Sequence, residues 1–368
     1  MDKTAGKLGF GLMRLPRRGV RIDVDQVAQM ADMFLDAGFT YFDTARVYPG
    51  SEKAAHKAIV KRHPRDSFTI ATKLNTMVAP TAKIARKQFE TSLRNLGCGY
   101  IDYYLLHGLM PANYRSYERL GCWEYARDLK RQGKVRYIGF SFHGGPELLD
   151  QLLTEQSDFD FVQLQINYAD WEDQRIASRA NYEVARAHDK PIVIMEPVKG
   201  GSLANPPHGV QKLMDAAAPN ASYASWAIRF AAGLDGVLSV LSGMSNVDQM
   251  ADNISFMRCF QPLDDSEMDV IRQARAIIGS SRDIPCTACR YCIEGCPRGI
   301  PIPDVYAAMN KQLISGQLDE ARAAYAAAVA QGGAASTCLA CGKCEAVCTQ
   351  HISIIEELRR CAATLESE

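Results

Sequence analysis

The chain has 368 residues, 47% of them hydrophobic, which is enough for one large domain and a second, smaller one. Its 42 Lys and Arg residues balance its 42 Asp and Glu residues, so charge gives no reason to expect a nucleic-acid or anionic-membrane partner. No apolar run approaches the ~18 residues of a membrane-spanning helix. The N-terminal stretch also lacks the charged-then-apolar layout of a secretory signal. We therefore expect a cytoplasmic protein that binds neither nucleic acid nor membranes.

Short apolar segments alternate with longer segments of helical period over the first two thirds of the chain. The expected strands are 8–12, 39–43, 68–73, 101–107, 135–141, 161–166, 192–195 and 237–241, and the expected helices include 24–37, 81–96, 117–132, 147–153 and 174–188. Buried strands separated by helix-length segments are typical of parallel βα units. Eight such units within about 250 residues predict an α/β fold, a (β/α)8 TIM barrel. A doubly wound sheet is the alternative, but no G-x-G-x-x-G motif follows a strand.

The region after the barrel is expected to be mostly helical. Residues 264–280 predict a helix that flanks the barrel, and residues 281–285 form the expected domain boundary. Residues 318–330 are rich in alanine and contain no helix breaker, so they favour a helix, as do residues 355–365. We predict a barrel domain over residues 1–280 and a small, mostly α-helical domain over residues 281–368.

Two cysteine runs with the same spacing stand in this second domain. They are Cys286-x2-Cys289-x2-Cys292-x3-Cys296-Pro297 and Cys338-x2-Cys341-x2-Cys344-x3-Cys348. This is the spacing with which bacterial-type ferredoxins hold [4Fe–4S] clusters, and in two-cluster proteins the fourth ligand usually comes from the other run. The predicted ligand sets are therefore Cys286, Cys289, Cys292 with Cys348, and Cys338, Cys341, Cys344 with Cys296.

A pair of structural zinc sites is the alternative interpretation of these metal-binding runs. Zinc modules usually pair two C-x2-C knuckles across a spacer, whereas this chain has two matching runs of four cysteines, which fit clusters better. A disulfide framework is disfavoured because the chain is expected to be intracellular. The remaining cysteines are interpreted as core or surface thiols.

Polar side chains follow the expected strands at the end where the active site of such a barrel lies. They are Asp43, Lys73, His107, Ser141, Gln163, Asn167 and Glu196. A single polar strand end is often only a solvated one. Several charges that converge on one mouth are costly unless they are used, so the set predicts an active site.

The residues around these strand ends resemble the aldo-keto reductase family. The resemblance rests on Phe42-Asp43-Thr44-Ala45 with Tyr48 and Ser51-Glu52 beyond it, on Ala71-Thr72-Lys73, on Leu105-Leu106-His107 and on Ile138-Gly139-Phe140-Ser141. It covers residues 7–257, and the whole chain resembles a subgroup that carries a C-terminal helical ferredoxin-like domain with two [4Fe–4S] clusters.

The resemblance implies a catalytic tetrad of Asp43, Tyr48, Lys73 and His107. Carbonyl reduction needs a hydride on carbon and a proton on oxygen. A free phenol has a pKa near ~10, and an ammonium group close to Tyr48 would lower that pKa and favour the phenolate. In this scheme Asp43 keeps Lys73 charged and aimed, and His107 donates a hydrogen bond to the carbonyl oxygen.

The same resemblance places a nicotinamide cofactor, NADP or NAD, at the barrel mouth. Ser141 and Gln163 match the pair that holds the carboxamide of the nicotinamide. The asparagine that commonly follows the serine is Phe142 here, and Met195 aligns with the aromatic residue that commonly stacks on the nicotinamide ring.

A second cofactor segment follows the last strand. Gly243-Met244-Ser245 with Gln249 and Asn253 resembles the family's cofactor segment. The lysine and arginine that many members place near the 2′-phosphate align with Gly243 and Gln249, so the preference between NADP and NAD stays open. The loop 199–202 is a weaker candidate for a phosphate contact.

These observations predict an oxidoreductase that transfers hydride between a nicotinamide cofactor and a small carbonyl or alcohol substrate, with two [4Fe–4S] clusters for electron transfer. Ferredoxin or another electron-transfer protein is the expected protein partner. A nicotinamide moves two electrons and a cluster moves one, so two alternatives stay open. One is a ferredoxin-coupled redox enzyme that uses a flavin or radical chemistry in the barrel. The other is a nucleotide-binding, redox-sensing module with structural clusters.

Overall fold

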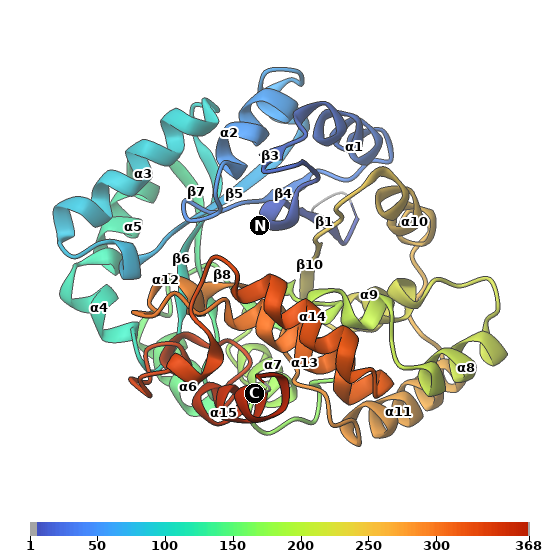
Figure 1. Cartoon of the computed structure of the whole chain (residues 1–368). Helices are drawn as coiled ribbons and strands as arrows, with labels where there is room; N and C mark the ends of the chain where they lie inside the picture. Colours follow the sequence, from blue (N-terminus) through green and yellow to red (C-terminus); the bar gives the residue numbers. More distant parts are fainter. Residues whose placement is uncertain (1–5, 367–368) are drawn as a thin grey trace.

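The computed structural model describes residues 6–366, and the ends of the two predicted domains, residues 1–5 and 367–368, lie outside this part. Eight parallel strands close into a barrel in the order β1-β10-β9-β8-β7-β6-β5-β4 (Figure 1). The strands are β1 Leu8–Gly11, β4 Tyr41–Asp43, β5 Thr69–Leu74, β6 Ile101–Leu109, β7 Val135–Phe142, β8 Phe161–Gln165, β9 Ile192–Met195 and β10 Val237–Ser242. Each expected strand is present, and the predicted barrel is confirmed.

A ring of helices surrounds the strands (Figure 1). They are α1 Val24–Asp36, α2 Ser51–Ala55, α3 Ala82–Leu96, α4 Tyr114–Arg119, α5 Cys122–Arg131, α6 Pro146–Glu155, α7 Ser178–Ala187, α8 His208–Ala217, α9 Tyr223–Gly233, α10 Val247–Met257 and α11 Asp265–Gly279. The expected helix 117–132 is wrong in one respect, because Gly121 at φ 64° separates α4 from α5. A left-handed residue interrupts an α-helix. A short hairpin, β2 Arg17–Arg18 with β3 Arg21–Ile22, was not expected from the sequence.

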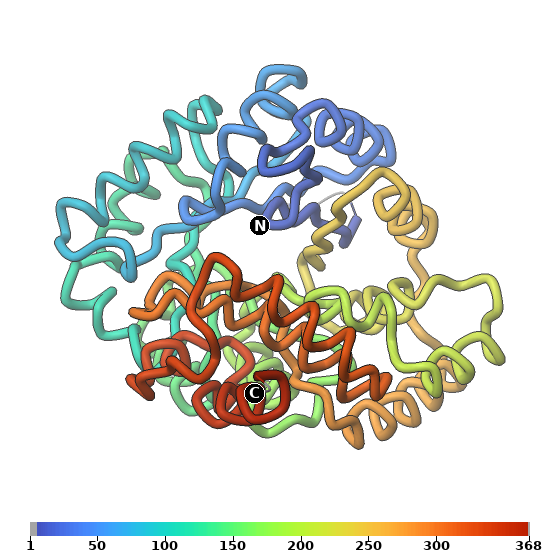
Figure 2. Tube along the Cα trace, viewed as in Figure 1, coloured from blue at the N-terminus to red at the C-terminus, as the bar shows by residue number. Residues whose placement is uncertain are grey.

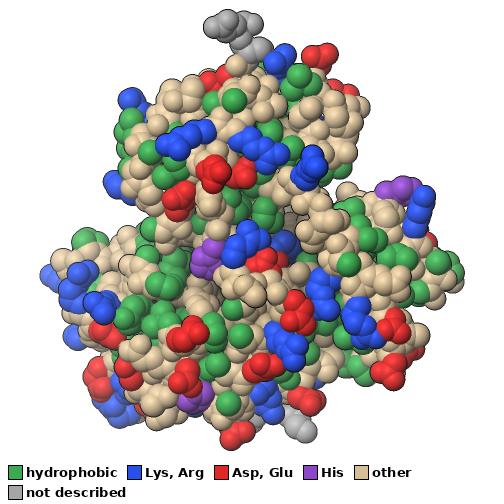
Figure 3. Space-filling view, turned by 90° about the horizontal axis from the view of Figure 1, so that it is seen from below, with side chains coloured by type: hydrophobic (Ala, Val, Ile, Leu, Met, Phe, Trp, Pro, Cys, Tyr) green, Lys and Arg blue, Asp and Glu red, His purple; other side chains and the backbone are tan. Residues whose placement is uncertain are grey.

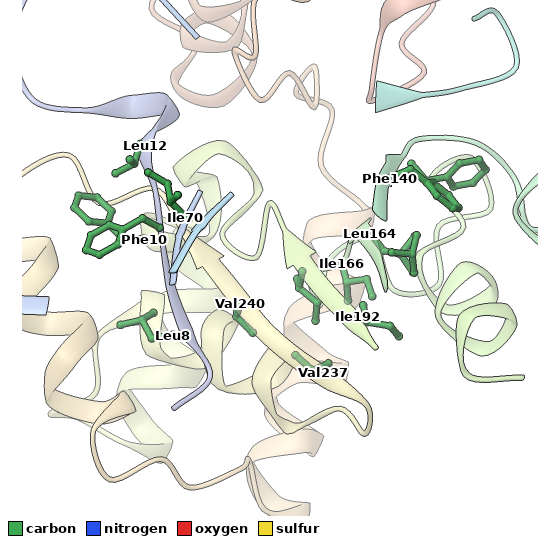
Figure 4. Close-up of a cluster of buried hydrophobic side chains, with 14 of the residues drawn as sticks. Leu8, Phe10, Leu12, Ile70, Phe140, Leu164, Ile166, Ile192, Val237 and Val240 are labelled. Carbon is green, nitrogen blue, oxygen red and sulfur yellow. The ribbon is translucent and has the colours of Figure 1, made fainter. Parts of the chain in front are cut away.

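Two apolar layers make the barrel a rigid scaffold. The larger layer lies between strands and helices and includes Phe10, Ile70 and Leu164 (Figure 4). The smaller layer fills the interior with side chains such as Tyr103 and Phe161. Burial of each large apolar side chain stabilises the fold by about 1.5–3 kcal/mol. The strand ends are therefore held in fixed positions.

The C-terminal region forms a helical unit with its own apolar core. Its helices are α12 Tyr291–Glu294, α13 Ile302–Ser315, α14 Leu318–Val329 and α15 Ile354–Leu365. Its core includes Ile300, Tyr306 and Leu358 and is separate from the barrel core. The orange and red helices cross one half of the barrel end in Figures 1 and 2, and Figure 3 shows two lobes with a constriction between them.

Side-chain contacts join this helical unit to the mouth of the barrel. Tyr291 reaches His107, and the Arg14 guanidinium donates to the carbonyl oxygen of Thr287 at 2.6 Å. Lys199 and Gln350 make a third contact at 3.2 Å. The helical unit therefore lies at the C-terminal ends of the strands, where the predicted active site is. In residues 6–366, no helix combines the length and the apolar character that crossing a membrane requires.

Candidate active site

The four predicted tetrad residues come together at the barrel mouth. Asp43 ends β4, Lys73 and His107 lie near the ends of β5 and β6, and Tyr48 lies in the loop before α2. Asp43, Lys73 and His107 are buried, and Tyr48 is half-buried. The ring centroids of Tyr48 and His107 are 5.7 Å apart, edge to face, and Lys73 Nζ lies 5.2 Å from the Tyr48 centroid.

Lys73 and Asp43 form a buried ion pair beneath Tyr48. Lys73 Nζ donates to Asp43 Oδ1 at 2.5 Å and to the carbonyl oxygen of Thr44 at 2.8 Å. Burial lowers the pKa of Lys73 from its ordinary value, and Asp43 opposes this shift. Burial likewise raises the pKa of Asp43, and Lys73 opposes it. Because each group supports the charge of the other, removing either one would leave an uncompensated buried charge.

The titration of Tyr48 differs from the sequence-based expectation. Burial raises the pKa of Tyr48 well above its ordinary value, and Tyr291, Asp43 and Glu196 add to the rise. The Lys73 ammonium, which is engaged by Asp43, does not outweigh these effects. The phenol is therefore held in its protonated form, which is the form that can donate a proton.

His107 is a neutral imidazole in this setting. Burial lowers the pKa of His107 well below its ordinary value, and Lys73 and His143 lower it further. Its Nε2 atom lies 3.2 Å from the hydroxyl of Tyr291, while its Nδ1 atom is buried with no hydrogen-bond partner among residues 6–366. A neutral imidazole can donate from one ring nitrogen and accept at the other.

A cavity of about 270 Å³ opens from the tetrad toward β10 and α10. It is lined by ten of the eleven predicted catalytic and cofactor-binding residues: Asp43, Tyr48, His107, Ser141, Gln163, Met195, Gly243, Ser245, Gln249 and Asn253. Lys73 lies behind Asp43 and does not line it. One connected cavity therefore joins the predicted catalytic group to the predicted cofactor group.

Ser141 and Gln163 stand side by side, because they are register partners on β7 and β8. Ser141 Oγ accepts a hydrogen bond from the backbone N–H of Gly108 at 2.7 Å, which leaves its own proton free to donate. Gln163 Oε1 is buried without a partner in the described part of the chain. A free acceptor beside a free hydroxyl suits a carboxamide, so this corner fits the group expected there.

The segment after β10 is held by its own hydrogen bonds. The N–H of Ser245 donates to Gln249 Oε1 at 2.7 Å, and Ser242 Oγ donates to Asn253 Oδ1 at 2.6 Å. Ser245 Oγ donates to the carbonyl oxygen of Arg14 at 2.7 Å. Gln249 is therefore turned onto its own loop. Among the described residues that line the cavity, Arg14 is the only lysine or arginine.

Glu196 adds a buried carboxyl group to the cavity wall. It follows β9 at φ 57°, and its Oε2 atom is buried without a partner in residues 6–366. Burial raises its pKa, and Arg14, whose Nη1 lies 3.9 Å away, opposes the shift. The loop after it was a weak candidate for a phosphate contact. Here Lys199 pairs with Asp170, and Gly200 packs against Thr287 of the helical unit.

Sequence reasoning missed Tyr291, which enters the barrel mouth from the first cysteine run. Its hydroxyl lies 3.2 Å from His107 Nε2 and shares a hydrogen bond with Tyr48. Tyr291 and Cys289 both line the main cavity. No local pattern marks a tyrosine between two cysteines as an active-site residue. Only the docking of the two domains brings it there.

The eight run cysteines line two further cavities. The first cavity is lined by Cys286, Cys289, Cys292 and Cys348, and the second by Cys296, Cys338, Cys341 and Cys344. These are the two predicted crossed sets. Three residues of one run and one of the other surround each space, as the ligands of a cubane do.

The two loops provide backbone donors as well as thiols. Ala340 N–H points at Cys338 Sγ at 3.5 Å, and the backbone N–H of Ala288 binds Cys286 in the same way. In residues 6–366 no three His, Cys, Asp or Glu side chains are arranged to hold a single metal ion. A tetrahedral zinc site would need four ligands about 2.3 Å from one point. Four cysteines line each of the two cavities, an arrangement that fits a cluster.

The comparisons with known proteins agree with this architecture. Residues 7–276 match the model of the Aldo/keto reductase family, and residues 285–352 match the model of the 4Fe-4S dicluster domain. The first match covers more than half of the chain, so the chain belongs to the aldo/keto reductase family. The predicted family and the predicted iron–sulfur domain are confirmed.

Curated relatives resemble parts of the chain. An aldo-keto reductase of Mycolicibacterium smegmatis is 29% identical over 150 residues, which are 40% of this chain and 50% of the relative. The aldo-keto reductase str7 of Strobilurus tenacellus is 28% identical over 216 residues, 55% of this chain and 61% of that protein. The chain thus spans between half and about three fifths of these two relatives. The oxidoreductase YqkF of Bacillus subtilis is 24% identical over 284 residues, 69% of this chain and 87% of its own length.

Solved structures share the barrel. The holo form of aldo-keto reductase AKR11C1 from Bacillus halodurans has a TM-score of 0.58 at 24% identity and covers 73% of this chain and 91% of its own. An aldo/keto reductase from Klebsiella pneumoniae, in complex with NADP and acetate, has a TM-score of 0.60 at 20% identity, with 74% and 95% covered. At these identities the likeness concerns the fold.

Proposed function

We propose that the barrel interconverts a carbonyl group and an alcohol at this mouth, with Tyr48 as the proton donor. The observation that carries the proposal is the meeting of Tyr48 and His107 over the buried Lys73–Asp43 pair, at one end of a cavity of about 270 Å³. The substrate oxygen would lie between the Tyr48 hydroxyl and His107 Nε2, within hydrogen-bond reach of both. The substrate is a small carbonyl compound or the corresponding alcohol.

The proton for the carbonyl oxygen comes from Tyr48 in this scheme. Burial keeps the phenol protonated, so the acid is present at neutral pH. Lys73 stabilises the phenolate that remains after proton transfer, because its ammonium lies beneath the ring. Asp43 holds Lys73 in place. His107 orients the substrate oxygen and stabilises the charge that develops on it.

We propose a nicotinamide nucleotide as the cofactor, held at its carboxamide by Ser141 and Gln163. When bound, the nucleotide would supply the hydride. Support comes from the buried acceptor on Gln163 and from the neighbour of known structure that was solved with NADP and acetate. Arg14 is the one lysine or arginine on the described cavity wall, and Gln249 is turned onto its own loop, so we expect little discrimination between NADP and NAD.

We further propose that residues 281–368 act as an electron-transfer domain for the barrel, residues 1–280. Each bound cluster would supply or accept one electron, so two such transfers would balance the hydride that the bound nucleotide carries. The first cysteine set adjoins the active-site cavity through Cys289, whereas Cys341 of the second set is exposed. This order suits a partner such as ferredoxin at the second set.

Replacement of Tyr48 by phenylalanine tests the barrel chemistry. The change removes one oxygen and little volume, so nucleotide binding and iron content should survive. Loss of the general acid should slow benzaldehyde reduction roughly 10²–10⁴-fold with either NADPH or NADH. Tyr223→Phe is the control, because that hydroxyl contacts Asp215 at 3.0 Å on the helical ring. Near-wild-type turnover in Tyr48→Phe would reject the proposal.

Metal analysis tests the iron–sulfur part. Anaerobically purified protein should contain about eight irons and as many acid-labile sulfides per chain, four in each cubane. Stoichiometric zinc without iron would contradict it. Calorimetric titration of the same material with NADPH and NADH should show binding of both nucleotides. A tightly bound flavin in that material would favour the flavin alternative.

A further inference from the structure

Tyr291 lies where the proposed substrate oxygen should bind. The two groups expected to hold that oxygen are the Tyr48 hydroxyl and His107 Nε2. The Tyr291 hydroxyl already lies 3.2 Å from His107 Nε2 and shares a hydrogen bond with Tyr48. A carbonyl oxygen cannot make both contacts while this hydroxyl does. The rings agree with this geometry, since the centroids of Tyr291 and His107 are 6.1 Å apart, edge to face.

The backbone holds Tyr291 in this position from both sides. Tyr291 is the first residue of α12 and lies between Cys289 and Cys292, which line the first cysteine cavity. The residue before it, Arg290, has φ 67°, and its guanidinium donates to Asp304 at 2.6 Å. A left-handed backbone conformation is unfavourable for a residue with a side chain, so the conformation of Arg290 is strained.

A neighbouring contact ties the same loop to the cavity wall. Arg14 donates to the carbonyl oxygen of Thr287 and also faces Glu196 across the cavity. Gly200 at φ 67° packs so closely that an added Cβ would lie 2.7 Å from the Thr287 carbonyl oxygen. The first cysteine loop is therefore held on the barrel mouth by two contacts at Thr287, which precedes Tyr291 in the same loop.

We propose that Tyr291 is a fifth active-site residue, contributed by the iron–sulfur domain, whose hydroxyl occupies the oxygen-binding position until a substrate displaces it. This inference rests on the proposed function. Access to the tetrad then depends on the loop that carries three ligands of the first cluster. Substrates that offer a strong acceptor oxygen, such as aldehydes and carboxylates, can replace the phenol, and hydrocarbons of similar size cannot.

The substitution Tyr291→Phe tests the proposal because it keeps the ring and removes the hydroxyl. Substrate no longer has to displace a hydrogen-bonded group, so kcat/KM for benzaldehyde should rise about three- to tenfold, mainly through a lower KM. The acetate dissociation constant, measured by calorimetry with nucleotide present, should fall by a similar factor. An unchanged or lower kcat/KM in a variant with full iron content would overturn the proposal.

Two comparisons keep this test separate from the proposed function. Tyr325→Phe is the matched control, because that hydroxyl contacts the backbone N–H of Ala335 at 2.8 Å, inside the helical unit, and the rate should not change. If Tyr48→Phe is inactive and Tyr291→Phe is not faster, the proposed function stands and the role of Tyr291 falls. If Tyr48→Phe stays active, the proposed function itself fails.

A second measurement covers the case in which Tyr291→Phe does not load its clusters. The wild-type holoprotein is crystallised with and without acetate. With acetate bound, an acetate oxygen should lie between Tyr48 and His107, and the Tyr291 ring should have moved. Acetate in that position beside an unmoved Tyr291 would overturn the proposal.

Discussion

The two cysteine loops have the same backbone conformation but face different surroundings. In both runs the residue before the second cysteine is left-handed, Ala288 and Ala340, each at φ 52°. The residue after the second cysteine is left-handed as well, as Arg290 at φ 67° in the first loop and Gly342 at φ 72° in the second. The next residue is Tyr291 in one loop and Lys343 in the other.

The surroundings of the two loops explain these different residues. The first loop faces the barrel, and its Cys289 lines the active-site cavity. In the second loop Leu339 is 54% exposed, and Cys341 is exposed as well. The spacing of the cysteines therefore encodes the cluster geometry, which both loops share. The residues between the cysteines encode whether a loop contacts the barrel or the solvent.

Substitution of one cysteine in each loop is expected to give the largest difference between the two loops. Cys292→Ser and Cys344→Ser should each lower the iron content from about eight to about four per chain, because each removes one ligand of one cubane. Only Cys292→Ser loosens the loop that carries Tyr291, so only this variant should raise kcat/KM for benzaldehyde, by about three- to tenfold. Iron and sulfide assays with steady-state rates check both expectations. Equal effects of both variants on the barrel would show that the loops do not differ in this way.

Most of the fold was predictable because its periodic signals are local. Buried strands such as 101–107 and 161–166 have few polar residues inside them, and the cysteine spacing restricts the possible clusters. The meeting of Asp43, Lys73 and His107 was predictable because each lies at or near the end of a parallel strand. The break at Gly121 was missed, since the helical period on both sides of this residue continues through it.

What could not be predicted depends on how the domains dock. Tyr291 reaches His107 across 184 positions of sequence, and Arg14 reaches Thr287 across 273. Neither pair has a periodic or motif signal, because each contact depends on the placement of two folded units. The raised pKa of Tyr48 has the same origin, since Tyr291 contributes to it along with burial.

Two glycine substitutions, Gly200→Ala and Gly342→Ala, test whether contact with the first loop, and not with the second, stabilises the barrel. In Gly200→Ala the new Cβ would meet Thr287 at 2.7 Å, and φ 67° would be strained. In Gly342→Ala φ 72° is strained, but no atom of the described residues lies within 4 Å of the new Cβ. We expect Gly200→Ala to destabilise the docked barrel by about 2–4 kcal/mol. Gly342→Ala should leave the barrel unchanged.

Tryptophan fluorescence during urea unfolding measures this difference. All three tryptophans, Trp123, Trp171 and Trp226, lie in the barrel, so the signal reports barrel unfolding. A Gly342→Ala shift as large as that of Gly200→Ala would mean that both loops support the barrel.

The smallest expected effect concerns pH at the same interface. His143 follows β7 and faces His351 of the helical unit, and burial, with a smaller contribution from His351, lowers the pKa of His143 to about 4 from an ordinary 6.5. Between these two values the unfolded chain binds more protons at this position than the folded chain does, so stability is greatest above pH 6.5 and falls as pH drops toward 4.

From pH 7 to pH 5 this residue should account for a loss of about 2 kcal/mol in barrel stability. In His143→Gln the free energy of unfolding, measured by urea and tryptophan fluorescence, should therefore change less between these two pH values, by about that amount. The control His208→Gln replaces an exposed histidine on α8 and should keep the wild-type pH dependence. If His143→Gln also keeps the wild-type pH dependence, the loss of barrel stability at low pH does not arise at His143. The difference between the two loops then depends on packing alone.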